Sequence, residues 1–160
     1  MTIQVGDRLP SATLTTMTAE GPKPLTISEL CEGKKVVLFA VPGAFTPTCS
    51  VQHLPGYVEN AQSLKDRGVD AVACVSVNDP FVMGAWGKDR EVGEDLMMLS
   101  DGNGDFTGAI GLEMDGSGFG LGTRSQRYAM IIDDGVVSTL NVESGPGLDV
   151  SSAETILSEL

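Results

Sequence analysis

The sequence has few of the residues from which metal centres and disulfide frameworks are built. Its 160 residues include one histidine and three cysteines, Cys31, Cys49 and Cys74. No two cysteines are close in sequence and histidine is scarce, so no metal site is expected. A sparse, odd number of cysteines also argues against a disulfide framework. It favours a reducing compartment, with the cytoplasm as the expected location.

Basic residues and long apolar runs are also scarce. Ten lysines and arginines stand against 22 aspartates and glutamates, which gives a formal net charge of −12. A nucleic acid or an anionic membrane surface would repel such a chain, so neither is expected as a partner. No apolar stretch approaches about 20 residues, so no membrane span is predicted. The N-terminal string MTIQVGDRLPSATL lacks the basic and apolar regions of a signal peptide.

What remains is an ordinary globular composition, in which 41% of the residues are apolar and 20% are charged. The length suits one domain over residues 1–160. The apolar run at residues 36–41 predicts a buried strand, and helical spacing follows over 51–64, with a kink expected at Pro55. A second apolar run at 69–77 predicts another strand. The order indicates a right-handed parallel βαβ unit.

The second half of the chain adds an antiparallel part to this unit. The expected elements are, in order, a helix from Pro80 capped by Asp79, a strand at 97–100, a Gly-rich loop at 102–122, a hairpin of strands 128–132 and 136–142 turning at Asp134-Gly135, and a helix opened by a capping box of Ser151 and Glu154. This layout predicts an α/β fold, a thioredoxin-like sandwich with a mixed central β-sheet flanked by helices.

The string VPGAFTPTCS at residues 41–50 lies between the first strand and the helix after it. Thr46 suits the helix cap, Pro47 suits the first helical position, and Cys49 then falls in the first turn. A thiol there faces unpaired backbone N–H groups and the positive end of the helix dipole, which favour the thiolate. The Thr46 hydroxyl, three positions earlier, is a candidate hydrogen-bond partner of the sulfur or of a molecule beside it.

A thioredoxin would carry Cys-x-x-Cys at this place, whereas this chain carries Thr46-x-x-Cys49. Cys49 therefore cannot close a short disulfide. It needs an incoming oxidant, and the resulting sulfenic acid must be resolved by another thiol. Two other interpretations are a buried cysteine that only packs and a thiol whose oxidation signals to a binding partner. His53 shares the helical face of Cys49 and is either a polarising group or an ordinary hydrogen-bonded residue.

Pro42, Thr46 and Cys49 spell the Pro-x-x-x-Thr-x-x-Cys signature of the peroxiredoxins. The chain resembles the type II, or peroxiredoxin-5, subfamily over nearly its whole length. The strings that carry the resemblance are VPGAFTPTCS, HLPGY at 53–57, SVNDPFVMGAWG at 76–87, GLGTRSQRYAMIIDDG at 120–135 and NVESG at 141–145.

The resemblance implies a thiol peroxidase that reduces hydrogen peroxide and organic hydroperoxides without a cofactor or metal. It implies that Cys49 is the peroxidatic cysteine, that Thr46 holds the peroxide and that Pro42 shields the sulfur. The family also uses an arginine, and the motif register favours Arg127 over Arg124. A guanidinium suits this role because it is always charged and presents several donors.

The family resemblance leaves the reductant open. The stretch GLDVSSAE at 147–154, where some members carry a resolving cysteine, has none. An external thiol, glutathione with glutaredoxin or thioredoxin, is therefore expected to reset Cys49, with Cys74 as the possible internal resolving thiol and Cys31 as incidental. A thiol–disulfide oxidoreductase on the same fold is the alternative enzyme. The family also implies a homodimer, for which Phe45, Phe81 and Trp86 are candidate contacts.

Overall fold

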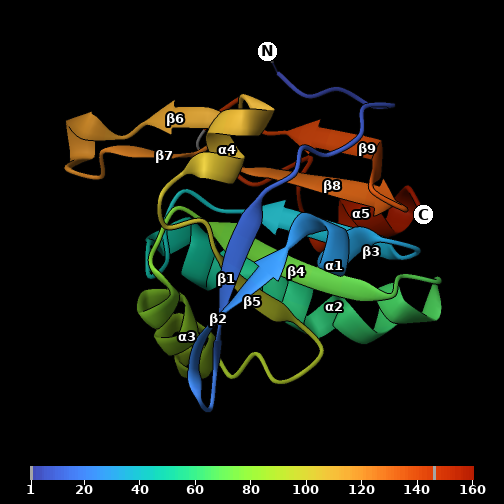
Figure 1. Ribbon diagram of the computed structural model, residues 1–160, viewed down its shortest axis with the longest axis horizontal. Helices are drawn as coiled ribbons and strands as arrows, with labels where there is room; N and C mark the ends of the chain where they lie inside the picture. Colours follow the sequence, from blue (N-terminus) through green and yellow to red (C-terminus); the bar gives the residue numbers. More distant parts are fainter. Residues whose placement is uncertain (1, 146) are drawn as a thin grey trace.

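The computed structural model describes residues 2–145 and 147–160, and a seven-stranded mixed sheet runs through its centre (Figure 1). The strand order is β2-β1-β5-β4-β3-β8-β9. These strands are β1 (Thr13–Thr18), β2 (Gly21–Thr26), β3 (Lys35–Ala40), β4 (Ala71–Ser76), β5 (Met97–Ser100), β8 (Tyr128–Asp133) and β9 (Val136–Val142). A separate pair, β6 (Glu113–Asp115) and β7 (Thr123–Ser125), forms an arm at the upper left of the view.

Helices cover both faces of the sheet. On one face lie η1 (Cys49–His53), α2 (Leu54–Asp66), α3 (Pro80–Asp89) and α5 (Ala153–Ser158), and on the other lie α1 (Ile27–Cys31) and α4 (Asp105–Ile110). A short 3₁₀ turn, η2 (Ser117–Phe119), lies between β6 and β7. The predicted thioredoxin-like sandwich with a mixed sheet between helices is confirmed.

Strand β3 shows why the central strands have continuous apolar sequences. Val36 and Leu38 pack into the cluster that includes α1 and α4, whereas Val37 and Phe39 pack into the cluster that includes α2 and α3. Successive side chains of a strand point to opposite faces, so a strand covered on both sides needs apolar residues throughout. β3 and β4 are parallel, as the βαβ prediction required.

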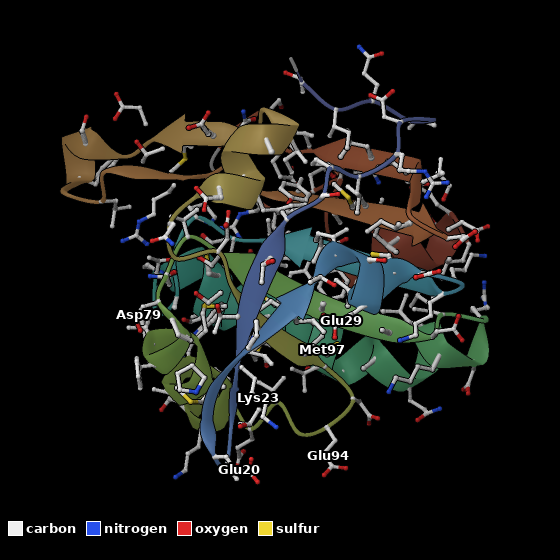
Figure 2. The ribbon with its side chains drawn as sticks, viewed as in Figure 1. Glu20, Lys23, Glu29, Asp79, Glu94 and Met97 are labelled. Carbon is white, nitrogen blue, oxygen red and sulfur yellow. The ribbon has the colours of Figure 1, made fainter. Side chains whose placement is uncertain are left out.

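Several local predictions are confirmed residue by residue. The strand expected at 97–100 is β5, and it pairs in parallel with β4. The Asp79 carboxylate (Figure 2) accepts a hydrogen bond of 2.8 Å from the Val82 N–H and caps α3. The β8–β9 hairpin turns at Asp134 and Gly135, whose φ angles of 48° and 82° are the left-handed values that an Asp-Gly turn provides.

Three features differ from the sequence-based expectation. The sequence does not predict the β1–β2 hairpin, in which Lys23 of β2 forms an exposed ion pair of 3.6 Å with Glu20 of the turn (Figure 2). Residues 102–122 are not a loop, because they contain α4, β6 and η2. The cap of the last helix is Ser152 and not Ser151, since Ser152 Oγ accepts from the Thr155 N–H at 3.2 Å.

Within the described part of the chain, none of the helices combines the length and the apolar character that crossing a membrane requires.

Candidate active site

The segment between β3 and α2 forms a tight loop before it becomes helical. Phe45 lies in the left-handed region, with a φ of 65°. The Thr46 carbonyl accepts the first helical hydrogen bond, from the Ser50 N–H at 2.9 Å. The Thr46 hydroxyl donates to the Gly43 carbonyl at 2.6 Å, not to the sulfur of Cys49. Thr46 therefore closes the loop and holds Cys49 in the first helical turns.

Cys49 begins a π-helical turn, η1, directly before α2. The Leu54 N–H donates to the Cys49 carbonyl, five residues back. Pro55, the next residue, has no N–H to donate to the carbonyl four positions earlier, so a wider turn here loses no backbone bond at Pro55. At the position where a kink at Pro55 is expected, the structure has this π-helical turn directly before α2. Trp86 Nε1 of α3 donates to Ser50 Oγ at 2.9 Å and ties the turn to the neighbouring helix.

Arg127 reaches the sulfur from the residue before β8, the strand next to β3. β8 runs antiparallel to β3 with Tyr128 opposite Ala40, so the residue before β8 lies beside the loop that leaves β3. Arg127 Nη2 donates to Cys49 Sγ at 3.0 Å. Cys49 is fully buried and Arg127 is only 7% exposed, so this contact is largely shielded from water. A charged donor in such a place stabilises a thiolate.

His53 holds the guanidinium and does not contact the sulfur. Arg127 Nη1 lies 2.8 Å from His53 Nδ1, and His53 Nε2 lies 3.0 Å from the Ser151 carbonyl. A guanidinium only donates hydrogen bonds and a carbonyl only accepts them. The unprotonated Nδ1 of His53 therefore accepts from Arg127, and Nε2 carries the ring proton and donates it to the Ser151 carbonyl. Burial, aided by the charge of Arg127, lowers the pKa of His53 to about 3 and keeps the ring neutral.

The contacts of Ser151 continue this network into the segment between β9 and α5. The Tyr57 hydroxyl donates to the same Ser151 carbonyl at 2.8 Å. Ser151 in turn donates to Glu143 through its N–H at 2.8 Å and its hydroxyl at 2.6 Å. No pattern in the sequence indicates this part of the site, because its partners lie up to 98 residues apart.

A pocket of about 630 Å³ opens beside Arg127. Residues of the 41–50 segment, the β6–β7 arm and the end of β9 line it, among them Pro42, Thr46, Met114, Phe119, Arg127 and Glu143. Because Arg127 both lines the pocket and contacts the buried sulfur, the pocket comes within one side chain of Cys49.

Arg124, the other candidate arginine, is bound to backbone carbonyls. Its Nη1 donates to the Pro42 carbonyl at 3.3 Å, and its Nε donates to the Leu121 carbonyl at 2.9 Å. Arg124 therefore fastens the β6–β7 arm to the loop that carries Pro42. The structure brings Pro42, Thr46 and Arg127 around the pocket and leaves Arg124 one layer away from the sulfur.

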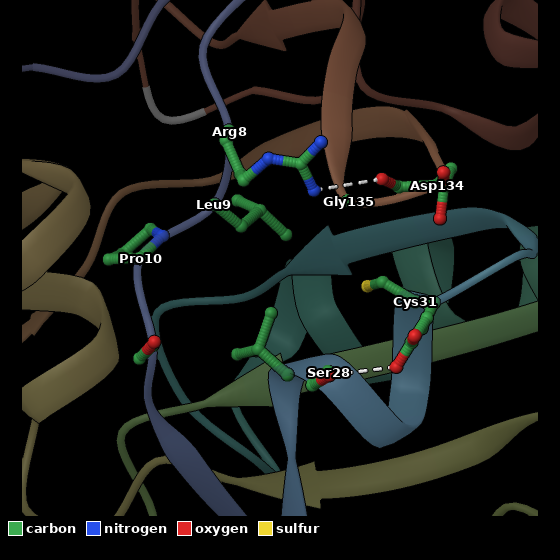
Figure 3. A pocket seen from close by; sticks show the side chains of 10 residues that line it. Arg8, Leu9, Pro10, Ser28, Cys31, Asp134 and Gly135 are labelled. Carbon is green, nitrogen blue, oxygen red and sulfur yellow. Dashed lines mark hydrogen bonds between the residues drawn. The ribbon is translucent and has the colours of Figure 1, made fainter.

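The other two cysteines are buried and lie on opposite faces of the sheet. Cys74, in β4, belongs to the same core cluster as Cys49, and burial raises the pKa of its thiol well above the usual range. Cys31 ends α1 on the opposite face, beside a pocket of about 390 Å³ near Arg8 and Asp134 (Figure 3). Burial raises the pKa of the Cys31 thiol to about 11. Among the residues that the structure describes, no charged side chain donates a hydrogen bond to either thiol, as Arg127 does to Cys49.

The aromatic residues expected at a dimer contact divide into two groups. Phe45 is 52% exposed and Phe81 is 65% exposed. Trp86 is fully buried, so the expectation that it forms a surface contact is wrong. Its ring packs beneath Phe45, with 6.4 Å between the ring centroids.

Comparisons with known proteins agree with this site. The redoxin family matches residues 4–157. The chain is 52% identical to chloroplastic peroxiredoxin-2E of Arabidopsis thaliana, over 99% of this chain and 69% of that protein. It is 48% identical to peroxiredoxin-2B of the same plant, over 99% and 98% of the two chains. The crystal structure of reduced Prx3 from Vibrio vulnificus in complex with hydrogen peroxide is 60% identical, covers 98% of each chain and has a TM-score of 0.94.

The resemblance drawn from the motifs is therefore confirmed over the whole chain, and it agrees with a buried cysteine held by an arginine at the start of a helix. Cys49 is the peroxidatic cysteine of this protein, which belongs to the redoxin family and, within it, to the type II peroxiredoxins, a group of thiol-dependent peroxidases.

Proposed function

We propose that Cys49 reduces hydrogen peroxide and organic hydroperoxides with the help of Arg127, Thr46 and Pro42. The observation that carries the proposal is the 3.0 Å contact between Arg127 Nη2 and Cys49 Sγ. Arg127 stabilises the thiolate and the peroxide oxygen. Thr46 accepts a hydrogen bond from the peroxide, because the proton of its own hydroxyl is committed to Gly43. Pro42 lines the pocket and limits the access of water to the sulfur.

The reaction needs no cofactor, because the sulfur carries the redox change. The Cys49 thiolate attacks one peroxide oxygen, a sulfur–oxygen bond forms, and the oxygen–oxygen bond breaks. The other oxygen leaves as hydroxide or alkoxide and takes up a proton to become water or an alcohol. Cys49 is left as a sulfenic acid. The guanidinium supports this step because charge moves from the sulfur to the leaving oxygen within its reach.

We also propose that an external thiol resolves the sulfenic acid. Glutathione condenses with Cys49–SOH to give a mixed disulfide and water, and glutaredoxin, by thiol–disulfide exchange, releases Cys49. Thioredoxin is the alternative reductant. Cys74 is a poor internal resolving thiol because it is buried in a central strand between β3 and β5, where its thiolate is disfavoured. A bridge between Cys49 and Cys74 would require the strand or the π turn to open.

A homodimer and a reducing compartment are two further parts of the proposal. A homodimer that covers Phe45 and Phe81 is supported by the exposure of both aromatic side chains, of which Phe45 belongs to the loop that leads to Cys49. The three cysteines are all free thiols, which supports a reducing compartment such as the cytoplasm.

The reductant is tested with the Cys74→Ser variant, and Cys31→Ser serves as the matched control. With glutathione and glutaredoxin, Cys74→Ser should keep most of the peroxidase turnover of the wild type. Mass spectrometry after peroxide treatment should find a glutathione adduct on Cys49. Loss of turnover in Cys74→Ser alone, with a Cys49–Cys74 peptide pair in the wild type, would instead identify Cys74 as the resolving thiol.

The same proteins also test the alternative function, that of a thiol–disulfide oxidoreductase. Such an enzyme would reduce a disulfide substrate such as insulin faster than it consumes peroxide. Thr46 occupies the position where a thioredoxin carries its first cysteine, so we expect disulfide reduction to be negligible beside peroxide consumption.

A further inference from the structure

The segment between β9 and α5 is fastened to the end of β9 by two polar side chains. Asn141 Nδ2 donates to the Val150 carbonyl at 3.0 Å. Glu143 accepts three hydrogen bonds at one carboxylate oxygen, from the Asp149 N–H at 2.9 Å, the Ser151 N–H at 2.8 Å and the Ser151 hydroxyl at 2.6 Å. The Glu143 N–H also donates to the Arg127 carbonyl at 2.9 Å. Glu143 is thus joined to the active-site arginine by a backbone hydrogen bond and by a chain of hydrogen bonds that passes through Ser151 and His53.

The Ser151 carbonyl is the part of this segment that faces the active site. It accepts from His53 Nε2 and from the Tyr57 hydroxyl, which occupies both of its lone pairs. His53 is 1% exposed and packs against Phe39, with 4.9 Å between the ring centroids. With Nε2–H committed to this carbonyl, the lone pair of Nδ1 is directed at Arg127. The orientation of Arg127 therefore depends on where Ser151 places its carbonyl.

We propose that Glu143 is a positioning residue for the peroxidase reaction, because through Ser151 and His53 it holds the Arg127 guanidinium against the Cys49 sulfur. The inference rests on the proposed role of Arg127 and adds a residue that lies outside the signature motif. In the described part of the chain, the Glu143 carboxylate makes its hydrogen bonds to Asp149 and Ser151, and none to the sulfur or to the Arg127 guanidinium. It acts by fixing the segment whose carbonyl fixes the tautomer and the angle of the histidine ring.

The charge of Glu143 and its positioning role act in opposite directions on the thiolate, which makes them separable. A nearby negative charge disfavours a thiolate, so removing it would by itself increase the thiolate fraction of Cys49. Loosening Arg127 would decrease that fraction. Partial burial alone would raise the pKa of the Glu143 carboxyl, but the hydrogen bonds from Ser151 and Asp149 outweigh it and lower that pKa, so the carboxylate is charged in either interpretation at neutral pH.

The test compares Glu143→Ala, Glu143→Gln and Ser151→Ala with a charge control, Glu154→Ala, an exposed carboxylate in the first turn of α5. Two quantities are measured, the thiolate absorbance of Cys49 as a function of pH and the rate of its reaction with hydrogen peroxide. Glu143→Ala should react about tenfold more slowly and show less thiolate at neutral pH, because a loosened Arg127 would weaken its one charged hydrogen bond to the Cys49 sulfur. Glu143→Gln keeps an acceptor oxygen and Ser151→Ala keeps the backbone donor, so both should fall between Glu143→Ala and the wild type.

A double-mutant cycle with Arg127→Ala separates this inference from the proposed function. If Glu143 acts through Arg127, Glu143→Ala should have little further effect in the Arg127→Ala background. Additive losses would show that Glu143 only supports the fold and would overturn the inference. More thiolate in both Glu143→Ala and Glu143→Gln would overturn it in favour of a pure charge effect. A wild-type rate in Arg127→Ala would contradict the proposed function itself. If Glu143→Ala does not fold, the same cycle is run with Ser151→Ala and Glu143→Gln.

Discussion

Replacing Arg127 with methionine removes the charged donor at 3.0 Å from the Cys49 sulfur but keeps a side chain of similar length. At an effective dielectric constant of about 20, two unit charges at that separation attract by about 5 kcal/mol. Desolvation of both groups offsets much of this, and hydrogen bonds to charged groups contribute a net 1.5–3 kcal/mol, or about 2 kcal/mol. A free-energy difference of that size corresponds to about a 30-fold change in a rate or equilibrium constant.

The rate of reaction with peroxide should fall by at least this factor, because Arg127 also stabilises the peroxide oxygen in the proposed mechanism. Rapid-mixing fluorescence follows the reaction, since Trp86 is the chain's one tryptophan and bonds to Ser50 beside the reacting cysteine. Arg127→Lys should be intermediate, because lysine keeps the charge but not the planar fork that contacts sulfur and His53 together.

Arg124→Met is the matched control. Arg124 binds the carbonyls of Pro42 and Leu121, so its loss should loosen the β6–β7 arm and slow the reaction by several-fold at most, about one-tenth of the effect at Arg127. A larger loss in Arg124→Met than in Arg127→Met, or an unchanged thiolate absorbance in Arg127→Met, would refute the assignment of the two arginines.

Two other predictions concern stability and assembly. The chain has one histidine, His53, whose pKa in the folded state is about 3, so the unfolded state binds the extra proton below about pH 6.5. This contribution to stability is present above that pH and is lost as the pH falls, by about 2 kcal/mol at pH 5. The free energy of unfolding measured in urea should therefore drop between pH 7 and pH 5 in the wild type, and His53→Gln should largely lack this drop. Equal drops in the two proteins would contradict the buried neutral state of His53. Phe45→Glu should convert the proposed dimer to a monomer in sedimentation velocity, and a wild type that sediments as a monomer at high concentration would count against the dimer.

Five of the seven strands of the central sheet, β3, β4, β5, β8 and β9, could be predicted from local signals in the sequence. β3 and β4 are buried on both faces and therefore have continuous apolar runs, and Asp134-Gly135 provides the backbone conformation that its turn needs. In contrast, β1 is rich in threonine, and β2 carries Pro22 and Pro24, which weaken a strand pattern and are tolerated here because β2 is an edge strand.

Short helices between glycines gave no usable periodicity. α4 has six residues and is bounded by Gly104 and Gly111, both with left-handed φ angles, so its sequence has the composition of a loop. The same limit applies to α1, which has five residues. The sequence predicts the cap of the last helix one residue too early. Ser151 looks like a cap in the sequence, but its hydroxyl donates to the Glu143 carboxylate, and Ser152 caps the helix.

The active site was predictable in part. Its cysteine is indicated locally, by the threonine and proline that begin a helix before it. Its arginine lies 78 residues later, and only the resemblance to the family motif favours Arg127 over Arg124. The connection of His53 to Ser151 and Glu143 depends on the sheet order and on a segment after β9, and no pattern in the sequence relates these residues.

The central claim is that the sulfur of Cys49 reacts with peroxide, and the most direct test is peroxide consumption by the reduced Cys49→Ser protein in the presence of thiol reductants. A hydroxyl is a far poorer nucleophile than a thiolate at neutral pH, so the variant should fold normally and consume no peroxide above the background of the reductant. The wild type, Cys31→Ser and Cys74→Ser should each form one sulfenic acid, on Cys49. Peroxide turnover by Cys49→Ser at a rate near that of the wild type would contradict the account.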